Sequence, residues 1–180
     1  MNMLSILAKR LRKNPACKEE LLRLLARPIP LPLINYVLNR TIVKIIRNYP
    51  SLFNRLSGHH HKTFLIEITN LSFDLILRPD PASPHLNAIR KKAGFYADAT
   101  ISGSFLTLIG MIDGRFDGDA LFFTRDLQIS GDTEAIVCLR NALDDIDGSV
   151  ASEAASYFGP IGVQFLTILR KVANEHQYST

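Results

Sequence analysis

The spacing of hydrophobic residues follows a helical period in the first third of the chain and a strand period after residue 62. Within residues 33–56, apolar side chains recur every three or four positions, which predicts one helix with a kink at Pro50. The apolar positions that share one face of this helix are Ile34, Leu38, Ile42, Ile45 and Tyr49. Three alternating prolines in residues 27–32 precede the helix and exclude its continuation toward the N-terminus.

Beyond residue 62 the apolar and polar residues alternate, as they do in half-buried strands. The segments 63–69 and 72–78 both show this pattern, and the short Asn70-Leu71 connection between them predicts a hairpin. Further strands are expected at 85–92, where the pattern is weak, at 95–103 and at 126–130. In the fourth of these strands Ala97 and Ala99 share a face, which we expect to leave room above the sheet.

The segment 104–112, SFLTLIGMI, is apolar on nearly all sides and is expected to form a short helix. A helix of this kind has to be buried on more than one side, or to face an apolar molecule that is not protein. We expect a longer helix at 132–146, and two helical pieces between 150 and 175 that are separated at Gly159-Pro160. The surplus of apolar surface around a small sheet predicts a dry cavity able to bind hydrocarbon.

The stretch SGDTEA, residues 130–135, joins the last strand to the helix that follows it. Gly131 permits the turn, and Asp132 is expected to cap the helix, with Glu134 also near its positive end. We therefore predict that Gly131 and Asp132 are structural residues and not catalytic ones.

Charge divides the chain into a basic arm and an acidic body. The 180 residues carry a net charge of +4, but residues 1–56 contain eleven basic residues against two acids, a net +9, and the remainder is at −5. Residues 3–13 combine Leu4, Leu7 and Leu11 with Lys9, Arg10, Arg12 and Lys13. This arrangement predicts reversible docking on an anionic membrane surface. Packing of the arm on the body, or on a second subunit of a homodimer, stays open as the alternative.

Catalytic and metal-binding motifs are missing from the sequence. Cys17 and Cys138 are far apart and predict free thiols, as in the reducing cytosol. The consecutive histidines at 59–61 do not converge on one ion, and the acidic residues at 144–147 lack the EF-hand spacing. No nucleophile elbow, phosphate loop or dinucleotide fingerprint occurs. We expect neither catalysis nor a metal, a cofactor or nucleic-acid binding.

Residues 64–147 resemble the sterol carrier protein 2 family. The resemblance lies in the hairpin TFLIEITNLSFDLILRP, the strand ADATISGS, the apolar helix SFLTLIGMI and the segment ALFFTRDLQISGDTEAIVCLRNALDDID. The pattern LFFxRxLxIxGDTE, matched by residues 121–134, is similar to that of the UbiT branch, the bacterial accessory factors of ubiquinone biosynthesis. The resemblance implies an α+β fold, in which helices cover an antiparallel sheet of about five strands and enclose a lipid tunnel. It also implies a role in oxygen-independent ubiquinone synthesis, with isoprenoid quinone precursors or phospholipid as ligand and hydroxylases as partners.

The expected division of the chain is a basic arm at 1–30, a lipid-binding domain at 31–150 and a C-terminal helical segment at 151–180 that packs on the tunnel or closes it. The predicted tunnel-lining residues are Phe73, Leu75, Leu106, Ile109, Met111, Phe122, Phe123, Ile136, Leu139 and Phe165. A lipid-binding accessory protein is the leading hypothesis; a membrane-docked scaffold and, third, a lipid hydrolase or thioesterase are the alternatives. The longest uncharged stretch, sixteen residues at 154–169, is shorter than the roughly 20 needed to span a bilayer. We expect a cytoplasmic protein, either free or peripheral on the inner membrane.

Overall fold

The computed structural model describes residues 30–56, 58–91, 95–112, 127–144 and 149–157, together with positions 159, 160, 162–164, 166, 167 and 170. The strands are β1 (Phe64–Ile68), β2 (Phe73–Arg78), β3 (His85–Arg90), β4 (Ala99–Gly103) and β5 (Leu127–Gly131). The helices are α3 (Leu31–Asn48), α4 (Ser51–Arg55), α5 (Phe105–Ile112), α7 (Thr133–Asp144) and α8 (Ser149–Ser156). The predicted α+β class is confirmed.

The five strands form one sheet in the order β3-β2-β1-β4-β5. The expected hairpin of β1 and β2 is present, with Phe64 opposite Leu77. β1 and β4 run parallel, whereas the other three neighbouring pairs are antiparallel, so the sheet is mixed and largely antiparallel as predicted. Because β3 and β4 point the same way, the chain between them has to cross β2 and β1.

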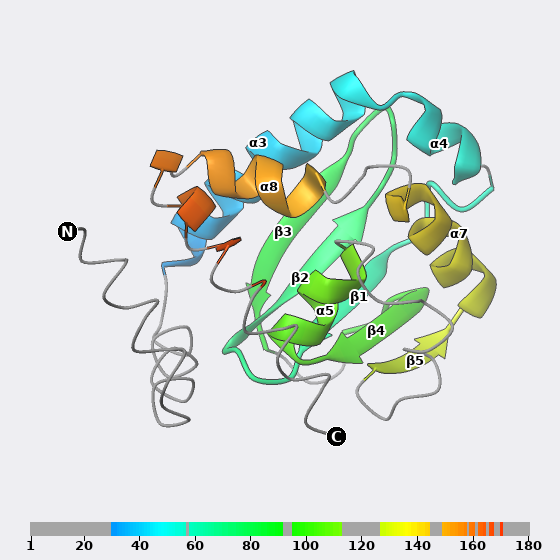
Figure 1. The fold of residues 1–180 in the computed structure, drawn as a ribbon. Coiled ribbons are helices and arrows are strands. Elements are labelled where there is room, and N and C mark those ends of the chain that lie inside the picture. The colour runs from blue at the N-terminus through cyan, green and yellow to red at the C-terminus, as the bar shows by residue number, and fades with distance from the viewer. Residues whose placement is uncertain are drawn as a thin grey trace.

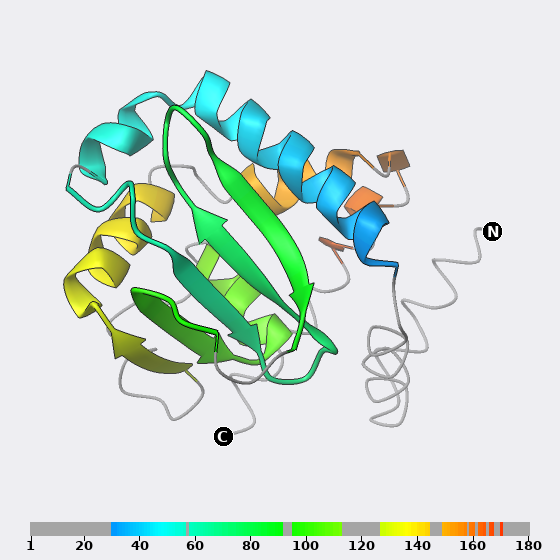
Figure 2. The same cartoon turned by 180° about the vertical axis from the view of Figure 1, so that it is seen from behind.

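The helices gather on one side of the sheet. In Figure 1, α5, α7 and α8 lie in front of the strands, and in Figure 2, seen from behind, the strands are nearest to the viewer. The helix side carries the hydrophobic core, which includes the completely buried Phe64, Leu56 and Ala135. Ile136 and Leu139, two of the apolar positions of α7, belong to the same core.

Helix α3 runs along the free edge of β3, as both views show (Figures 1 and 2). The side-chain amide of Asn35 accepts a hydrogen bond from Ala88 N–H at 2.6 Å and donates one to Ala88 C=O at 3.3 Å. Asn39 adds a side-chain bond to Asn87 at 3.1 Å. An edge strand exposes unpaired backbone groups that invite aggregation, and the Asn35 amide occupies two of them. This contact explains why the weakly patterned segment 85–92 contains a regular strand.

The single helix predicted at 33–56 is two helices. α3 ends at Asn48, where Tyr49 N–H still bonds to Ile45 C=O at 2.8 Å, and α4 begins after Pro50. Pro50 lacks the N–H that a continuous helix would need at this position, so the chain turns instead of bending. The predicted inward face is confirmed, since Ile42 and Ile45 are buried in the core and Ile34, Leu38 and Tyr49 pack against it.

One strand, the fourth, was predicted to be longer than it is. The fourth strand begins at Ala99 and not at Phe95, so Ala97 lies outside it, and Ala99 itself is fully buried in the core. Helix α8 ends at Ser156, shortly before the Gly159-Pro160 pair where a division of the C-terminal helices was expected. Strand ends are set by the partner strand, and a chain's own pattern does not contain this information.

Candidate functional site

One row of apolar residues crosses all five strands on the helix side of the sheet. The pairing places Ile66 of β1 opposite Leu75 of β2 and Ile101 of β4. Leu75 lies opposite Ala88, and Ile101 opposite Ile129, so the row reads Ala88, Leu75, Ile66, Ile101 and Ile129. Because side chains alternate along a strand, this row points to the same side as the buried Phe64, two residues earlier in β1.

Three residues of this middle row, Leu75, Ile66 and Ile129, are less covered than the neighbouring rows, whereas Ala88 and Ile101 are buried. Phe64, Leu77 and Ala99 form the adjacent row and are all buried. Ile66 and Leu75 are only half-buried, although they lie on central strands and on the side that carries the helices. The described helices therefore leave parts of these apolar side chains accessible in the middle of the sheet, where an apolar ligand has something to contact.

Helix α5 lies over this part of the sheet (Figure 1) and contains no charged residue. Its N-terminus is held by two side chains. Ser104 Oγ accepts a hydrogen bond from Thr107 N–H at 3.2 Å, and Asn70 Oδ1, from the β1–β2 turn, accepts one from Phe105 N–H at 2.9 Å. These bonds satisfy two of the free N–H groups at the helix start and tie α5 to the hairpin below it.

The two sides of α5 have different surroundings. Phe105, Leu108 and Met111 recur every three residues and pack on the core cluster. Leu106 points about 100° further around the helix than Phe105, yet only 8% of its surface is exposed. Helix α5 is thus buried on more than one side, which confirms the prediction made from its sequence. Ile109 and Met111 are half-buried.

The structure brings together most of the predicted lining residues that it describes. Phe73, Ile136 and Leu139 belong to one cluster, and Leu75 and Met111 pack against it. Leu106 and Ile109 share α5 with Met111 but are not members of that cluster among the described residues. Several predicted residues lie outside the described part of the chain: Phe122, Phe123, Phe165, Lys9, Arg10, Arg12 and Lys13.

The prediction omitted Ile66, Ile129 and Phe105, which are half-buried and pack against the same core cluster. The alternation within 63–69 had assigned Ile66 to the correct face of its strand. It could not tell that Ile66 lies in the incompletely covered row, because that depends on the pairing of five strands and on the length of each helix.

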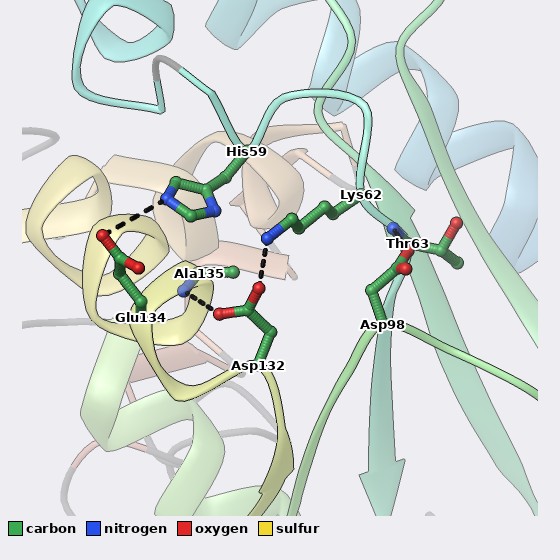
Figure 3. A network of polar contacts seen from close by, with 7 residues as sticks. All are labelled: His59, Lys62, Thr63, Asp98, Asp132, Glu134 and Ala135. Atoms are coloured by element: carbon green, nitrogen blue, oxygen red, sulfur yellow. Dashed lines mark hydrogen bonds and ion pairs between the residues drawn. The ribbon is translucent and has the colours of Figure 1, made fainter.

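A second constellation surrounds Gly131 and Asp132, at the end of β5 (Figure 3). Asp132 Oδ1 accepts a hydrogen bond from Ala135 N–H at 2.9 Å, the helix cap expected from the sequence. Its other carboxylate oxygen is paired with the Lys62 ammonium. Asp132 N–H donates to Asp98 C=O at 2.9 Å, and Asp98 Oδ2 in turn accepts from Thr63 N–H at 2.7 Å. These bonds are all internal and join the starts of β1, β4 and α7, which supports a structural role for the pair.

His59 lies beside this network. Its Nε2 is 4.0 Å from Glu134 Oε1 at the start of α7 (Figure 3), and its buried Nδ1 has no hydrogen-bond partner. Among the described residues, no three His, Cys, Asp or Glu side chains are grouped closely enough to hold a metal ion. Cys138 is a free thiol on α7 that packs against the core.

Acid should weaken the network through Asp132. The hydrogen bond from Lys62, then that from Ala135 N–H, lowers the pKa of Asp132 below its ordinary value of 3.8, against the opposing effect of burial. A group with a lowered folded pKa contributes stability that is present above its unfolded pKa and is lost as the pH falls through the folded value. We expect Asp132→Asn, which keeps the cap but cannot titrate, to remove this part of the acid sensitivity.

Urea midpoints measured at about pH 5 and about pH 3 test this expectation. The wild type should lose more stability between these two pH values than Asp132→Asn does, and equal losses would contradict the assignment. Complete loss of function in a stably folded Asp132→Asn protein would show that Asp132 has a chemical role.

No helix in the part of the chain that the structure describes has both the length and the apolar character needed to cross a membrane. A comparison with curated protein sequences gave no match.

A comparison with solved structures found similar ones. One is described as "UbiJ-SCP2 Ubiquinone synthesis protein", with 21% identity, coverage of 63% of this chain and 95% of that chain, and a TM-score of 0.51. Another is the sterol carrier protein domain 2 of Helicoverpa armigera, with 12% identity, coverage of 68% and 93%, and a TM-score of 0.48. The first of these likenesses shows a common fold.

The family comparison covers the sheet, α5 and all of α7. The model of the SCP-2 sterol transfer family matches residues 42–144, which is more than half of the chain. This span contains the half-buried row of the sheet, the uncharged helix above it and the Gly131-Asp132 turn. The chain therefore belongs to the SCP-2 sterol transfer family.

Proposed function

We propose that this protein is a non-catalytic lipid-binding accessory protein. Its ligand is an isoprenoid quinone precursor or a phospholipid, which it holds or delivers for oxygen-independent ubiquinone biosynthesis. The observation that carries the proposal is the set of half-buried apolar residues Ile66, Leu75 and Ile129 in the middle row of the sheet beneath α5, a helix without charge. Each methylene of a lipid chain buried there contributes about 0.8 kcal/mol, so a long chain is held without a polar anchor.

The proposed lipid-binding surface consists of half-buried apolar residues from two elements. The sheet contributes Ile66, Leu75 and Ile129, and α5 contributes Phe105, Ile109 and Met111. The buried Phe73, Leu106, Ile136 and Leu139 support this surface, and Phe122, Phe123 and Phe165 complete the proposed lining. We take residues 31–150 as the lipid-binding unit, with 151–180 packing on it and 1–30 as a separate arm.

The pathway assignment rests on a narrower observation than lipid binding does. The pattern LFFxRxLxIxGDTE at residues 121–134 is the feature shared with the UbiT branch. Within it, Leu127 is buried and Gly131 and Asp132 form the structural turn, so these three positions are explained by the fold alone. The residues of the pattern before Leu127 are therefore those that would distinguish this branch. We propose the hydroxylases of the pathway as the partners of this protein.

Native mass spectrometry of the full chain, purified from its own host under mild conditions, tests the proposed ligand. We expect a co-purified lipid of defined mass, identified after extraction as an isoprenoid or a phospholipid. A protein that carries no lipid from its host, and that takes up none from vesicles of the host's lipids, would contradict the proposal. A lipid-free protein that still assembles with biosynthetic hydroxylases would favour the scaffold instead.

The basic arm supplies a route from the bilayer to the apolar site. Long-chain lipids are scarcely soluble in water, so a carrier has to collect them at a membrane, and basic residues near an anionic surface contribute roughly 1 kcal/mol each. We expect binding to phosphatidylglycerol vesicles to decrease at high salt. Reversing Arg10, Arg12 and Lys13 should weaken it by more than about tenfold.

Vesicle flotation of the intact chain and of a protein lacking residues 1–27 measures the effect, with neutral phosphatidylcholine vesicles as the control. If the two proteins float equally with anionic vesicles, the arm is not the membrane contact. Packing of the arm on the body or on a second subunit then becomes the better account.

A further inference from the structure

The outer face of α3 presents a narrow stripe of residues that stay exposed in the part of the chain that the structure describes. Leu33, Tyr36, Arg40, Val43 and Arg47 follow one another at alternating steps of three and four. All five are exposed, and Leu33, Tyr36 and Val43 have 50%, 58% and 43% of their surface accessible. Alternate steps of three and four are the spacing by which one helix receives another in a coiled coil. We name these five residues the α3 seam.

The α3 seam has a defined polar centre. The Arg40 guanidinium lies over the Tyr36 ring, 5.5 Å from its centroid, which fixes the cation within the stripe. Tyr157, also exposed, donates a hydrogen bond from its hydroxyl to Arg40 C=O at 3.3 Å and so borders the seam. Figure 1 shows α8 lying alongside α3 on this side of the molecule.

The charge of the α3 seam indicates which kind of partner can bind to it. The chain has no Asp or Glu between residues 21 and 66, whereas the α3 seam carries Arg40 and Arg47. A second copy in a two-fold contact would place these cations against one another. Residues 1–27 of the same chain carry seven basic residues against two acids, and they would be repelled as well.

The width of the stripe favours a helix over a bilayer. A helix that lies in a membrane interface needs a broad apolar face, whereas a stripe confined to the a and d positions matches the contact surface of a single partner helix. An arginine at the centre of such a stripe can donate two parallel hydrogen bonds to a carboxylate. The occupant with matching chemistry is an amphipathic helix whose apolar stripe is accompanied by Glu or Asp.

From this spacing, exposure and charge we infer that the α3 seam docks an acidic amphipathic helix of a partner protein. The first three residues of the α3 seam precede the segment 42–144 that matches the family model. The seam is on the outer face of α3, whereas the proposed lipid-binding surface is on the helix side of the sheet. Arg40 is its specificity-determining residue, and Leu33, Tyr36 and Val43 supply the apolar contacts.

Photo-cross-linking with the full chain in its native host tests the inference. The probe p-benzoyl-phenylalanine replaces Tyr36, and in a matched control it replaces Val137, which is 46% exposed on α7. We expect an adduct from position 36 alone, and mass spectrometry of the linked peptide should identify an acidic helical segment. Adding Arg40→Glu should lower the yield at least about tenfold, as expected for a central charge pair.

The charge pair has its own control. Changing the facing partner carboxylate to Lys should restore cross-linking to the Arg40→Glu chain. Thermal unfolding verifies that each variant is folded, and Arg40→Gln replaces Arg40→Glu if the latter is unstable. An adduct with lipid, with a second copy or with a non-acidic segment overturns the inference, as does an unchanged yield with Arg40→Glu or no adduct at position 36.

Discussion

Replacing Gly131 by alanine is expected to destabilise the protein by about 3 kcal/mol or more. Gly131 ends β5 with φ of +82°, a left-handed conformation that costs any residue with a Cβ about 1–2 kcal/mol. In addition, a Cβ there would lie 2.4 Å from Asp98 C=O and 3.1 Å from Ala99 Cα. Both neighbours are backbone atoms, so no side chain can move aside, and β5 would have to separate from β4.

The chain provides a matched control at Gly58. Its φ of +86° is similar, but a Cβ built there meets nothing within 4 Å, so Gly58→Ala carries the conformational cost without the collision. The difference between the urea midpoints of the two variants, at constant m-value, therefore measures the cost of the collision between the new Cβ of Gly131→Ala and the backbone of Asp98 and Ala99. Equal losses at the two positions would contradict the assignment of Gly131 to the β4–β5 junction.

The Gly131-Asp132 turn was predictable from the sequence because its chemistry is local. A glycine that permits a turn and a carboxylate one residue before a helix act on neighbours within three positions. Their distant partners were not predictable. Lys62 and Asp98 come from other strand ends, 70 and 34 positions before Asp132, and only the assembled sheet brings them to it.

Strand positions were similarly predictable, whereas strand neighbours were not. The period-two pattern located β1 and β2, and the short connection between them implied their antiparallel pairing. The parallel pairing of β1 with β4 depends on a crossover, for which the sequence has no local signal. The composition of the proposed lipid-binding surface depends on that pairing, because Ile129 joins the row of Ile66 only through β4 and β5.

Asp74 shows how burial can depart from the alternation. Asp74 lies between Phe73 and Leu75 in β2, and its side chain points to the opposite face of the sheet from theirs. It is nevertheless buried. Asp74 Oδ1 accepts a hydrogen bond from Ile68 N–H at 3.0 Å, and the Lys91 ammonium lies 4.0 Å away. Lys91 also donates to Ile68 C=O at 2.7 Å. The Asp74 carboxylate thus stabilises the β1–β2 turn. Asn70 of the same turn accepts a hydrogen bond from the first residue of α5.

The lipid-binding surface itself is expected to lose its ligand when one central isoleucine becomes polar. Ile66→Asn places an amide in the middle of the half-buried row, where a bound acyl or isoprenoid chain would leave it without hydrogen bonds. An unsatisfied amide of this kind costs about 1–3 kcal/mol, which lowers lipid occupancy by roughly tenfold to a hundredfold. Native mass spectrometry of the purified variant measures that occupancy.

Ile76→Asn is the matched control, because Ile76 is also half-buried on a central strand but lies on the opposite face of the sheet. Both variants lose an isoleucine of similar exposure, so we expect similar decreases in the free energy of unfolding. Only Ile66→Asn should lower lipid occupancy, because only its side chain points toward α5. If both variants retain lipid, the ligand does not lie over the middle row. If both variants lose lipid equally, the loss does not depend on which face of the sheet is changed. That outcome contradicts a lipid-binding surface confined to the helix side.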